Sequence, residues 1–165
     1  MNLRIEPLTR IHNRKAFSCS DETVDQFLRQ KAMQDQELDL SRTMVLTNTA
    51  HDPTGIIGYH TLAITQIPQE QIPNDRPKIK RGIPVILLGQ LGIDSEYQGM
   101  GYGERMLTDA QSRVCDIAAK VGVRAMILDA RTERLASWYE SHGFIRLAGS
   151  MRMVKRIETI KLEFL

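Results

Sequence analysis

Three glycines precede a helix-like segment in the stretch YQGMGYGERML, which runs from Tyr97 to Leu107. The first turn of a helix leaves about four backbone N–H groups unpaired, and the helix dipole places roughly half a positive charge at that end. Because Gly99, Gly101 and Gly103 lack Cβ atoms, the backbone there can adopt unusual dihedral angles and approach an anion closely. The spacing predicts a turn that binds a phosphate or pyrophosphate, although a flexible strand-to-helix connection would show the same pattern.

The common nucleotide-binding folds do not explain this stretch. A P-loop ends in Gly-Lys-Ser or Gly-Lys-Thr, whereas this chain continues Gly103-Glu104-Arg105. A dinucleotide-binding fold places its glycine-rich turn after the first strand of a βαβ unit, whereas this turn lies past the middle of the chain. Neither of these folds fits the glycine stretch well.

A second candidate for chemistry is Tyr139, on a predicted helix that Thr132 can cap. A phenol with a pKa near 10 stays protonated at neutral pH and can donate its proton to a developing anion. However, Leu135, Trp138 and Tyr139 share one face of the helix, so core packing is the simpler explanation of the pattern alone. We expect Trp138 to lie in the core.

The composition is that of one globular domain, residues 1–165. Hydrophobic residues make up 42% of the chain and charged residues 25%, and the net charge of +2 is too small to indicate nucleic-acid binding by itself. No apolar run approaches the roughly 20 residues that cross a bilayer, and the N-terminus lacks the apolar core of a signal peptide. We therefore expect a cytoplasmic protein with no membrane association. Cys19 and Cys115 lack metal-ligand spacing, so we expect two buried thiols and no metal.

The hydrophobic periodicity predicts alternating strands and helices. Strands are predicted at residues 3–8, 42–48, 55–65, 85–94, 125–130, 144–149 and 151–157. Helices are predicted over residues 18–39 with Ser20 or Asp21 as N-cap, from the glycine stretch to Gly122, and from Thr132 to His142. Residues 66–84 hold four prolines and are predicted to form a long connection. This order is typical of an α/β or α+β fold with a mixed central sheet flanked by helices.

Two motifs in these elements resemble those of a known family. QGMGYG, from Gln98 to Gly103, resembles the Gln/Arg-x-x-Gly-x-Gly/Ala motif of the GNAT acyltransferase superfamily, which follows the fourth strand and opens a helix. WYESHGF, from Trp138 to Phe144, resembles the YEKxGF signature of the same family. Two motifs at this separation are more specific than either alone, so the chain is identified as a member of the GNAT superfamily.

The resemblance is closer to one group, the GNAT toxins of bacterial toxin–antitoxin pairs, and covers roughly residues 14–155. The similar stretches are FSCSDETVDQFLRQKAMQDQ, SRTMVL, GYHTLA, IPVILLGQLGIDSEYQGMGYGERML and WYESHGF. Those toxins acetylate the α-amino group of aminoacyl-tRNA and thereby stop translation. The resemblance implies an acetyl-CoA-dependent N-acetyltransferase of this kind, with aminoacyl-tRNA as substrate, a cognate antitoxin as partner, and a homodimeric assembly.

The resemblance also implies roles for individual residues. Backbone groups of Leu91 and Ile93 would pair with the pantetheine arm of acetyl-CoA, and the glycine turn would bind its pyrophosphate. The implied cofactor-binding residues are Leu91, Ile93, Gln98, Gly99, Met100, Gly101, Tyr102, Gly103, Glu104 and Thr132. Tyr139 falls on the position that protonates the departing CoA thiolate. The chain departs from the family at two positions: Gln90 stands where members often carry Arg, and Thr132 stands where many carry Asn.

The acceptor amine must be neutral to attack a thioester. A lysine amine with a pKa near 10.4 is almost wholly protonated at pH 7, whereas an α-amino group with a pKa near 8 is free in roughly a tenth of molecules. His60, on a predicted strand, is a candidate base, although a structural histidine is the simpler interpretation. An α-amino substrate therefore suits this chain better than a lysine.

Cations gather in the long connection, where RPKIKR spans Arg76 to Arg81. One hypothesis is a clamp for tRNA phosphates, with Ile79 anchoring the loop, and the other is an ordinary solvated loop. The residues expected to contact tRNA are Arg42, Arg76, Lys78, Lys80 and Arg81. Two alternatives to tRNA acetylation stay open: acetylation of a protein N-terminus or a small amine, and a binding module without turnover.

Overall fold

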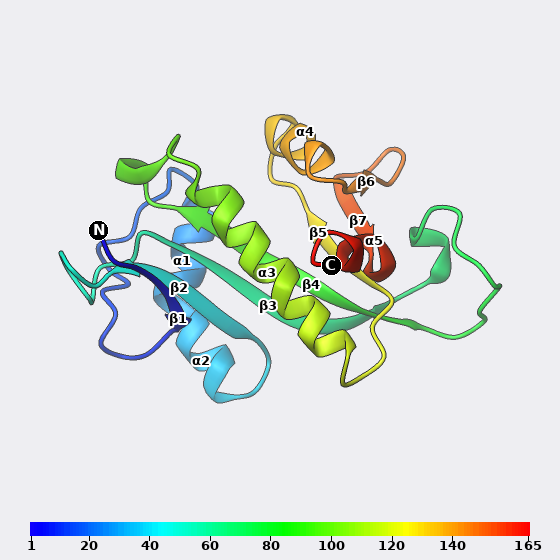
Figure 1. The fold of residues 1–165 in the computed structure, drawn as a ribbon, viewed down its shortest axis with the longest axis horizontal. Coiled ribbons are helices and arrows are strands. Elements are labelled where there is room, and N and C mark those ends of the chain that lie inside the picture. The colour runs from blue at the N-terminus through cyan, green and yellow to red at the C-terminus, as the bar shows by residue number, and fades with distance from the viewer. The chain divides into compact units, whose positions relative to one another are not determined.

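The computed structural model describes residues 1–165 and divides into two compact units. Unit 1 comprises Met1–Ala63 with Gly89–Ala110, and unit 2 comprises Ile64–Leu88 with Gln111–Leu165. The strands are β1 (Leu3–Pro7), β2 (Arg42–Asn48), β3 (Gly58–Ile67), β4 (Ile83–Ile93), β5 (Ala125–Asp129), β6 (Ile145–Arg146) and β7 (Arg152–Arg156) (Figure 1). The helices are α1 (Glu22–Gln30), α2 (Ala32–Glu37), α3 (Tyr102–Ala118), α4 (Glu133–Ser141) and α5 (Ile157–Leu162).

The seven strands form one mixed sheet in the order β1-β2-β3-β4-β5-β7-β6. β1, β2 and β3 pair antiparallel, β4 pairs parallel with β5, and β7 pairs antiparallel with both β5 and β6. The chain runs from one unit into the other within β3, β4 and α3. The predicted mixed sheet with flanking helices is confirmed.

Unit 1 carries helices on both faces of its part of the sheet. Tyr59 and His60 are neighbours on β3, so their side chains point to opposite faces. The Tyr59 hydroxyl donates to Val24 O of α1 at 2.6 Å, and His60 Nε2 lies 2.8 Å from Asp109 Oδ2 of α3. The core on the α1 side consists of Leu8, Phe17, Val24, Leu28, Ala32, Val45, Ile56 and Tyr59.

Unit 2 has a core of its own, which the parallel pair β4–β5 and the antiparallel strand β7 build. In this pairing Val85 lies opposite Ala125, and Ile127 lies opposite Val154. The buried side chains of this core are Ile67, Ile72, Ile83, Val85, Ala125, Ile127 and Val154. The β3–β4 connection extends its apolar surface, because Ile79 packs against this cluster as predicted.

Several predicted boundaries were wrong. The first predicted helix is two helices, α1 and α2, which meet at Lys31, where φ is −122°. α3 ends at Ala118 rather than beside Gly122, and bonds from Lys120 N and Val121 N to Ile117 O close its last turn. The sequence did not predict α5, because a six-residue helix with one buried side chain, Ile160, is too short to show a period.

Two predictions about burial were also wrong. Trp138 is only half-buried and Leu135 is 38% exposed, because the inward face of α4 carries Ala136 and Tyr139 instead. Cys19 and Cys115 are partly exposed rather than fully buried. The longest helix, α3, is too short and too polar to span a membrane, and so is every other helix.

Candidate active site

The glycine turn lies in unit 1, after β4 and before α3. A short 3₁₀ turn, η2 (Ser95–Tyr97), leads from β4 into it. Gly99 and Gly101 have φ angles of +78° and +84°, in the left-handed region that glycine adopts without strain. A Cβ atom added at either position would meet no protein atom within 4 Å. The backbone conformation therefore requires these glycines, and the approach to the backbone is open.

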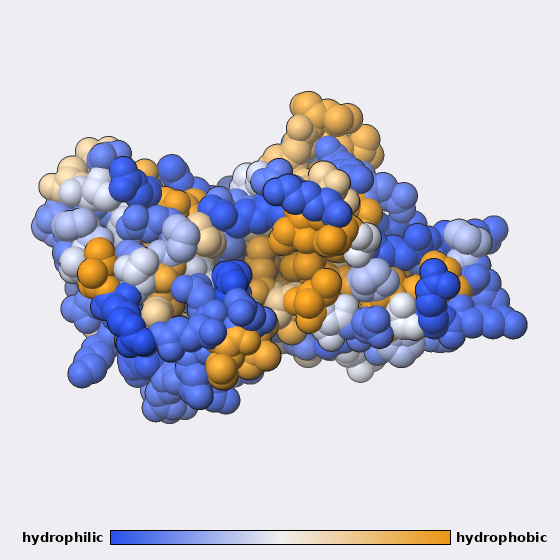
Figure 2. Space-filling view, turned by 90° about the horizontal axis from the view of Figure 1, so that it is seen from below, coloured by the Kyte–Doolittle hydropathy of each residue, from blue (hydrophilic) through white to orange (hydrophobic).

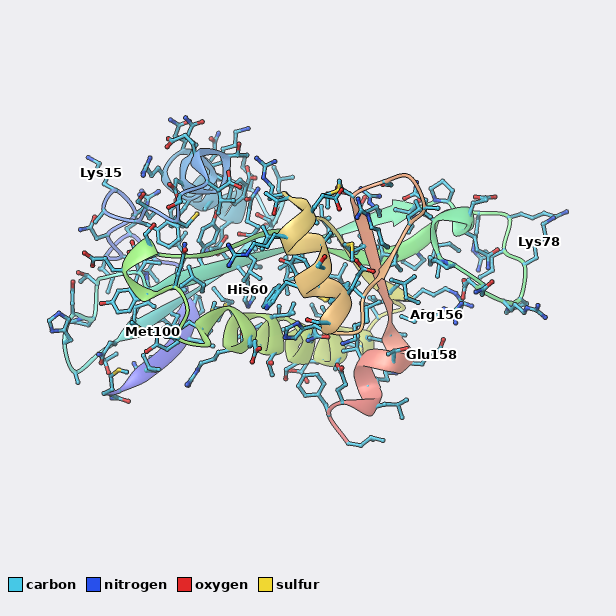
Figure 3. All side chains as sticks on the ribbon, turned by 90° about the horizontal axis from the view of Figure 1, so that it is seen from above. Lys15, His60, Lys78, Met100, Arg156 and Glu158 are labelled. Atoms are coloured by element: carbon cyan, nitrogen blue, oxygen red, sulfur yellow. The ribbon has the colours of Figure 1, made fainter.

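The start of α3 can present N–H donors to an anion. Arg105 N donates to Gly101 O at 3.2 Å, and the amides ahead of it belong to the first turn, which has no partners within the helix. The helix has 17 residues, so its dipole adds positive potential at this end. Met100 is 62% exposed and lies at the turn (Figure 3). This geometry suits a phosphate, and the assignment to the CoA pyrophosphate stays a prediction.

The side chain of Gln98 shapes the turn. Its Nε2 donates to Cys19 O at 3.0 Å and to Ile93 O at 2.9 Å. The same two segments are joined by Ser95 N, which donates to Ser18 O at 2.8 Å. Ser18 N also donates to Asp94 Oδ2, and the hydroxyls of Ser20 and Ser95 bond to each other. The motif glutamine thus ties the segment before α1 to the end of β4. No sequence pattern indicates this contact, because its partners lie far apart along the chain.

Leu91 and Ile93 of β4 are half-buried and pack towards Leu46, Ile57 and Met106. Between them, a Cβ atom at Gly92 would approach Val24 Cγ1 at 2.8 Å, so α1 leaves no room for a larger residue. Both side chains pack into this cluster, and the pairing of their main chain with a pantetheine arm stays a prediction. Tyr102 packs in the same cluster, and Glu104 is exposed.

His60 is fully buried, and its Nε2 lies 2.8 Å from Asp109 Oδ2. Its Nδ1 is buried as well and has no hydrogen-bond partner. A ring without exposed surface between β3 and α3 is typical of a structural residue. The geometry therefore favours the structural interpretation over the role of general base.

Tyr139 of α4, in unit 2, is 6% exposed. Its ring makes edge-on contacts with Trp138 and Phe144, with centroids 4.9 and 5.6 Å apart. Burial raises the pKa of Tyr139 above its ordinary value, and neither a hydrogen bond nor a charge contributes to the shift. The phenol therefore stays protonated. Its hydroxyl forms no hydrogen bond with a group of unit 2. These properties suit a proton donor, and the catalytic role stays a prediction.

Both ends of α4 are fixed by hydrogen bonds. Thr132 is the predicted N-cap, and its Oγ1 accepts from Leu135 N at 3.1 Å. Gly143, with φ +90°, ends the helix, and Phe144 N donates to Tyr139 O at 3.1 Å. The hydroxyl of Thr132 thus has a structural role, and its contact with the cofactor stays a prediction.

Lys155 of β7 forms a hydrogen bond with the end of α4, three residues after Tyr139. Its buried Nζ donates to His142 O at 2.7 Å, to Gln111 Oε1 at 2.6 Å and to both carboxylate oxygens of Glu163. A lysine is rarely buried unless it is paired, and this one links α3, α4 and the residue after α5. Sequence reasoning missed Lys155, because nothing in MRMVKRI marks an inward-facing lysine.

The residues predicted to contact tRNA fall in both units. Arg42 is in unit 1, where Asp39 Oδ1 at 2.6 Å and Gln36 O at 2.9 Å already engage its guanidinium. The other four are exposed on the β3–β4 connection of unit 2: Arg76, Lys78, Lys80 and Arg81. The structure groups these four and gives Arg42 a separate, structural pairing.

The order of strands and the glycine turn opening α3 after β4 are those of an N-acyltransferase that uses a CoA thioester. The chain matches the acetyltransferase (GNAT) domain over residues 41–146. It therefore belongs to the GNAT acetyltransferase family and is an N-acetyltransferase, as predicted.

Two relatives and one solved structure show which members of the family this chain resembles. The chain is 31% identical to "Probable toxin TacT" of Sinorhizobium fredii over 169 residues, 95% of this chain and 92% of that protein. It is 29% identical to "tRNA-acetylating toxin" of Mycobacterium tuberculosis over 130 residues, 78% and 76% of the two chains. A solved structure of a mutant AtaT toxin, bound to the C-terminus of the antitoxin AtaR and acetyl-CoA, is 25% identical with a TM-score of 0.84, covering 99% of both chains.

Proposed function

We propose that the protein transfers the acetyl group of acetyl-CoA to the α-amino group of an aminoacyl-tRNA and acts as the toxin of a toxin–antitoxin pair. The observation that carries the proposal is the similarity to a tRNA-acetylating toxin over 78% of this chain. The likeness to a probable toxin over 95% of the chain supports it.

The residues of each unit have separate parts in the proposed reaction. In unit 1 the turn from Gln98 to Gly103 binds the pyrophosphate of acetyl-CoA through backbone N–H groups. The neutral amine attacks the thioester carbonyl, an amide bond forms, and the C–S bond breaks. Tyr139 gives its proton to the CoA thiolate, and the amine loses a proton to a base that is not assigned. A positioned proton donor of this kind contributes typically 10²–10⁴ in rate.

The proposed substrate suits the chemistry of the acceptor and the charge of unit 2. An α-amino group is neutral often enough at pH 7 to react without a strong base, in contrast to lysine. The exposed cations of the β3–β4 connection offer contacts to tRNA phosphates, which position RNA without reading its bases. Acetylation of the α-amino group would stop translation in the cytoplasm. A cognate antitoxin and a homodimeric assembly belong to the same proposal.

The direct test is incubation of the protein with labelled acetyl-CoA and charged total tRNA. Nuclease digestion and mass spectrometry then identify the acetylated aminoacyl-adenosine. We expect label in one or a few aminoacyl species and none in deacylated tRNA. Peptides with free N-termini and small amines are offered in parallel reactions. Label confined to a peptide or a small amine would replace the tRNA proposal with the alternative acetyltransferase function.

A further inference from the structure

The β3–β4 connection of unit 2 borders a shallow, open hollow of about 620 Å³. Its polar lining includes Gln66, Gln69, Glu70, Lys78, Lys80 and Arg81. The surface of this connection is largely hydrophilic (Figure 2). In Figure 3, Lys78 lies at the outer edge of the connection and its side chain points away from the ribbon. The hollow therefore opens among cations on an exposed polar segment.

The cations at this hollow differ from those on the body of unit 2. Lys78, Lys80 and Arg81 are exposed and form no ion pair. On the body, by contrast, Arg124 pairs with Asp75, Arg152 with Asp129, and Arg146 with Glu133. These three cations are thus available to an anion, and Glu70 is the one carboxylate among the residues that line the hollow.

Gln69 fixes the shape of the connection from within. Its Oε1 accepts from Ile79 N at 2.7 Å, and its Nε2 donates to Pro77 O at 2.8 Å and to Asp75 Oδ2 at 3.1 Å. One side chain therefore holds the two sides of the loop together. Ile79, placed between the cations Lys78 and Lys80, is half-buried and packs against the core of unit 2.

Asp75 joins the same loop to Arg124, the residue before β5, and to Arg156 of β7. Its carboxylate is 4% exposed and accepts from Arg124 Nε at 2.7 Å and Nη2 at 3.0 Å. Arg124 also donates to Arg76 O, and Arg156 donates to Pro73 O. Burial acts to raise the pKa of Asp75, but the hydrogen bonds from Arg124 and Gln69 outweigh it and lower that pKa. The carboxylate is therefore ionised at neutral pH and keeps these bonds.

We propose that the β3–β4 connection is a phosphate-binding pocket for the RNA substrate, formed before the substrate arrives, with Asp75 and Gln69 as its positioning residues. The proposal rests on the proposed function, because it assigns the RNA-binding part of that site. A free loop would lose backbone conformational entropy when it becomes ordered on binding. A loop that is already ordered avoids this loss and binds more tightly with the same charges.

The salt dependence of tRNA binding distinguishes the cations that contact phosphates from the residues that keep the loop ordered. Each lost phosphate contact lowers the slope of log affinity against log salt by roughly 0.7 to 0.9, because fewer counterions are released. Removing cations should therefore reduce both the affinity and the slope. Releasing the loop leaves the cations in place, so it should reduce the affinity and leave the slope unchanged.

The experiment measures binding of deacylated tRNA by fluorescence anisotropy at several salt concentrations. The compared proteins are wild type, the triple variant Lys78→Ala/Lys80→Ala/Arg81→Ala, and the single variants Asp75→Asn and Gln69→Leu. Gln71→Leu is the matched control, because Gln71 lies in the same 3₁₀ turn, η1 (Gln69–Gln71), but its Oε1 accepts only from Arg152. We expect each single variant to bind about tenfold more weakly with an unchanged slope. The control should stay within about twofold of wild type.

Hydrogen exchange supplies an independent readout. The amide of Ile79 bonds to Gln69 Oε1, so its exchange should accelerate in both single variants and slow again when tRNA is added. Affinity for acetyl-CoA and the thermal midpoint report whether each variant is folded. If Asp75→Asn does not fold, Gln69→Leu, which removes no charge, carries the test.

The outcomes separate this proposal from the proposed function. Wild-type affinity in Asp75→Asn and Gln69→Leu, with exchange at Ile79 accelerated, would overturn the pre-formed pocket and leave tRNA binding intact. A reduced slope in these variants would also overturn it, because contacts would then have been lost rather than loosened. If the triple variant bound tRNA with wild-type affinity and slope, the connection would not bind RNA. The proposed substrate would then need another surface.

Discussion

Two buried tyrosines, one in each compact unit, have similar surroundings and different hydrogen bonding. Tyr59 of β3 is fully buried, packs edge-on against Phe17 at 5.4 Å, and donates its hydroxyl proton to Val24 O at 2.6 Å. Tyr139 of α4 is 6% exposed and packs edge-on against two aromatic rings, but its hydroxyl forms no hydrogen bond.

The difference lies in the availability of a proton. Burial raises the pKa of both phenols, so both are protonated at any physiological pH. The proton of Tyr59 is held by a main-chain carbonyl of α1 and joins that helix to the sheet. The proton of Tyr139 is committed to no partner in unit 2. Burial and aromatic contacts therefore do not distinguish a structural tyrosine from a candidate acid, whereas the hydroxyl partner does.

The largest expected effect comes from Tyr139→Phe. Turnover should fall on the order of 10²–10⁴-fold, because the proton donor is removed while the aromatic packing remains. Affinity for acetyl-CoA should hold, since the predicted pyrophosphate turn belongs to unit 1. Thiol release with charged tRNA measures turnover, and titration calorimetry measures affinity. If turnover stayed within a few-fold of wild type, Tyr139 would be a packing residue like Tyr59.

The next effect concerns the cofactor turn, the functional part of unit 1. Gly101→Val should weaken acetyl-CoA binding about tenfold or more, because a β-branched residue is strained at φ +84° and its side chain would block the backbone. Gly122→Ala is the matched control, since a Cβ atom there meets nothing within 4 Å and its φ is not positive. Calorimetry on both folded variants measures the affinity. Unchanged affinity in Gly101→Val would refute the assignment of the turn.

Tyr59→Phe should show the opposite pattern to Tyr139→Phe. Turnover should be retained, whereas the free energy of unfolding should fall by about 1 kcal/mol, because one buried hydrogen bond to Val24 O is lost. In a chain of this size the thermal midpoint should fall by about 2–4 °C. Thermal unfolding and thiol release on the same sample make the comparison. A loss of turnover as large as that of Tyr139→Phe would remove the distinction between the two residues.

The smallest expected effect is on the pH profile. The rate at limiting aminoacyl-tRNA should rise as the α-amino group deprotonates near pH 8. A raised pKa keeps Tyr139 protonated to higher pH than a free tyrosine, so no decline due to Tyr139 should appear below pH of about 10. Initial rates of wild type and Tyr139→Phe should give profiles of the same shape. A decline below pH 10 in wild type alone would show that the pKa is not raised.

Local features of the fold were predictable because their causes lie within a few residues. Asp21 caps α1 by accepting from Thr23 N, and Thr132 caps α4, both as the sequence indicates. The glycine turn has the left-handed φ angles that its composition favours. The break at Lys31 and the partial exposure of Trp138 were not predictable, because apolar spacing does not say which side of a helix finds a neighbour.

The sequence by itself determined the family, the order of the seven strands along the chain and the two motif positions, since these depend on local propensity and on spacing along the chain. Only the tertiary structure decided the partners of Gln98, Asp75 and Lys155. Their hydrogen bonds reach Cys19, Arg124 and Gln111, which are 79, 49 and 44 residues away in sequence. A hydrogen bond forms where folding brings a donor and an acceptor within about 3 Å, and no local pattern encodes that distance.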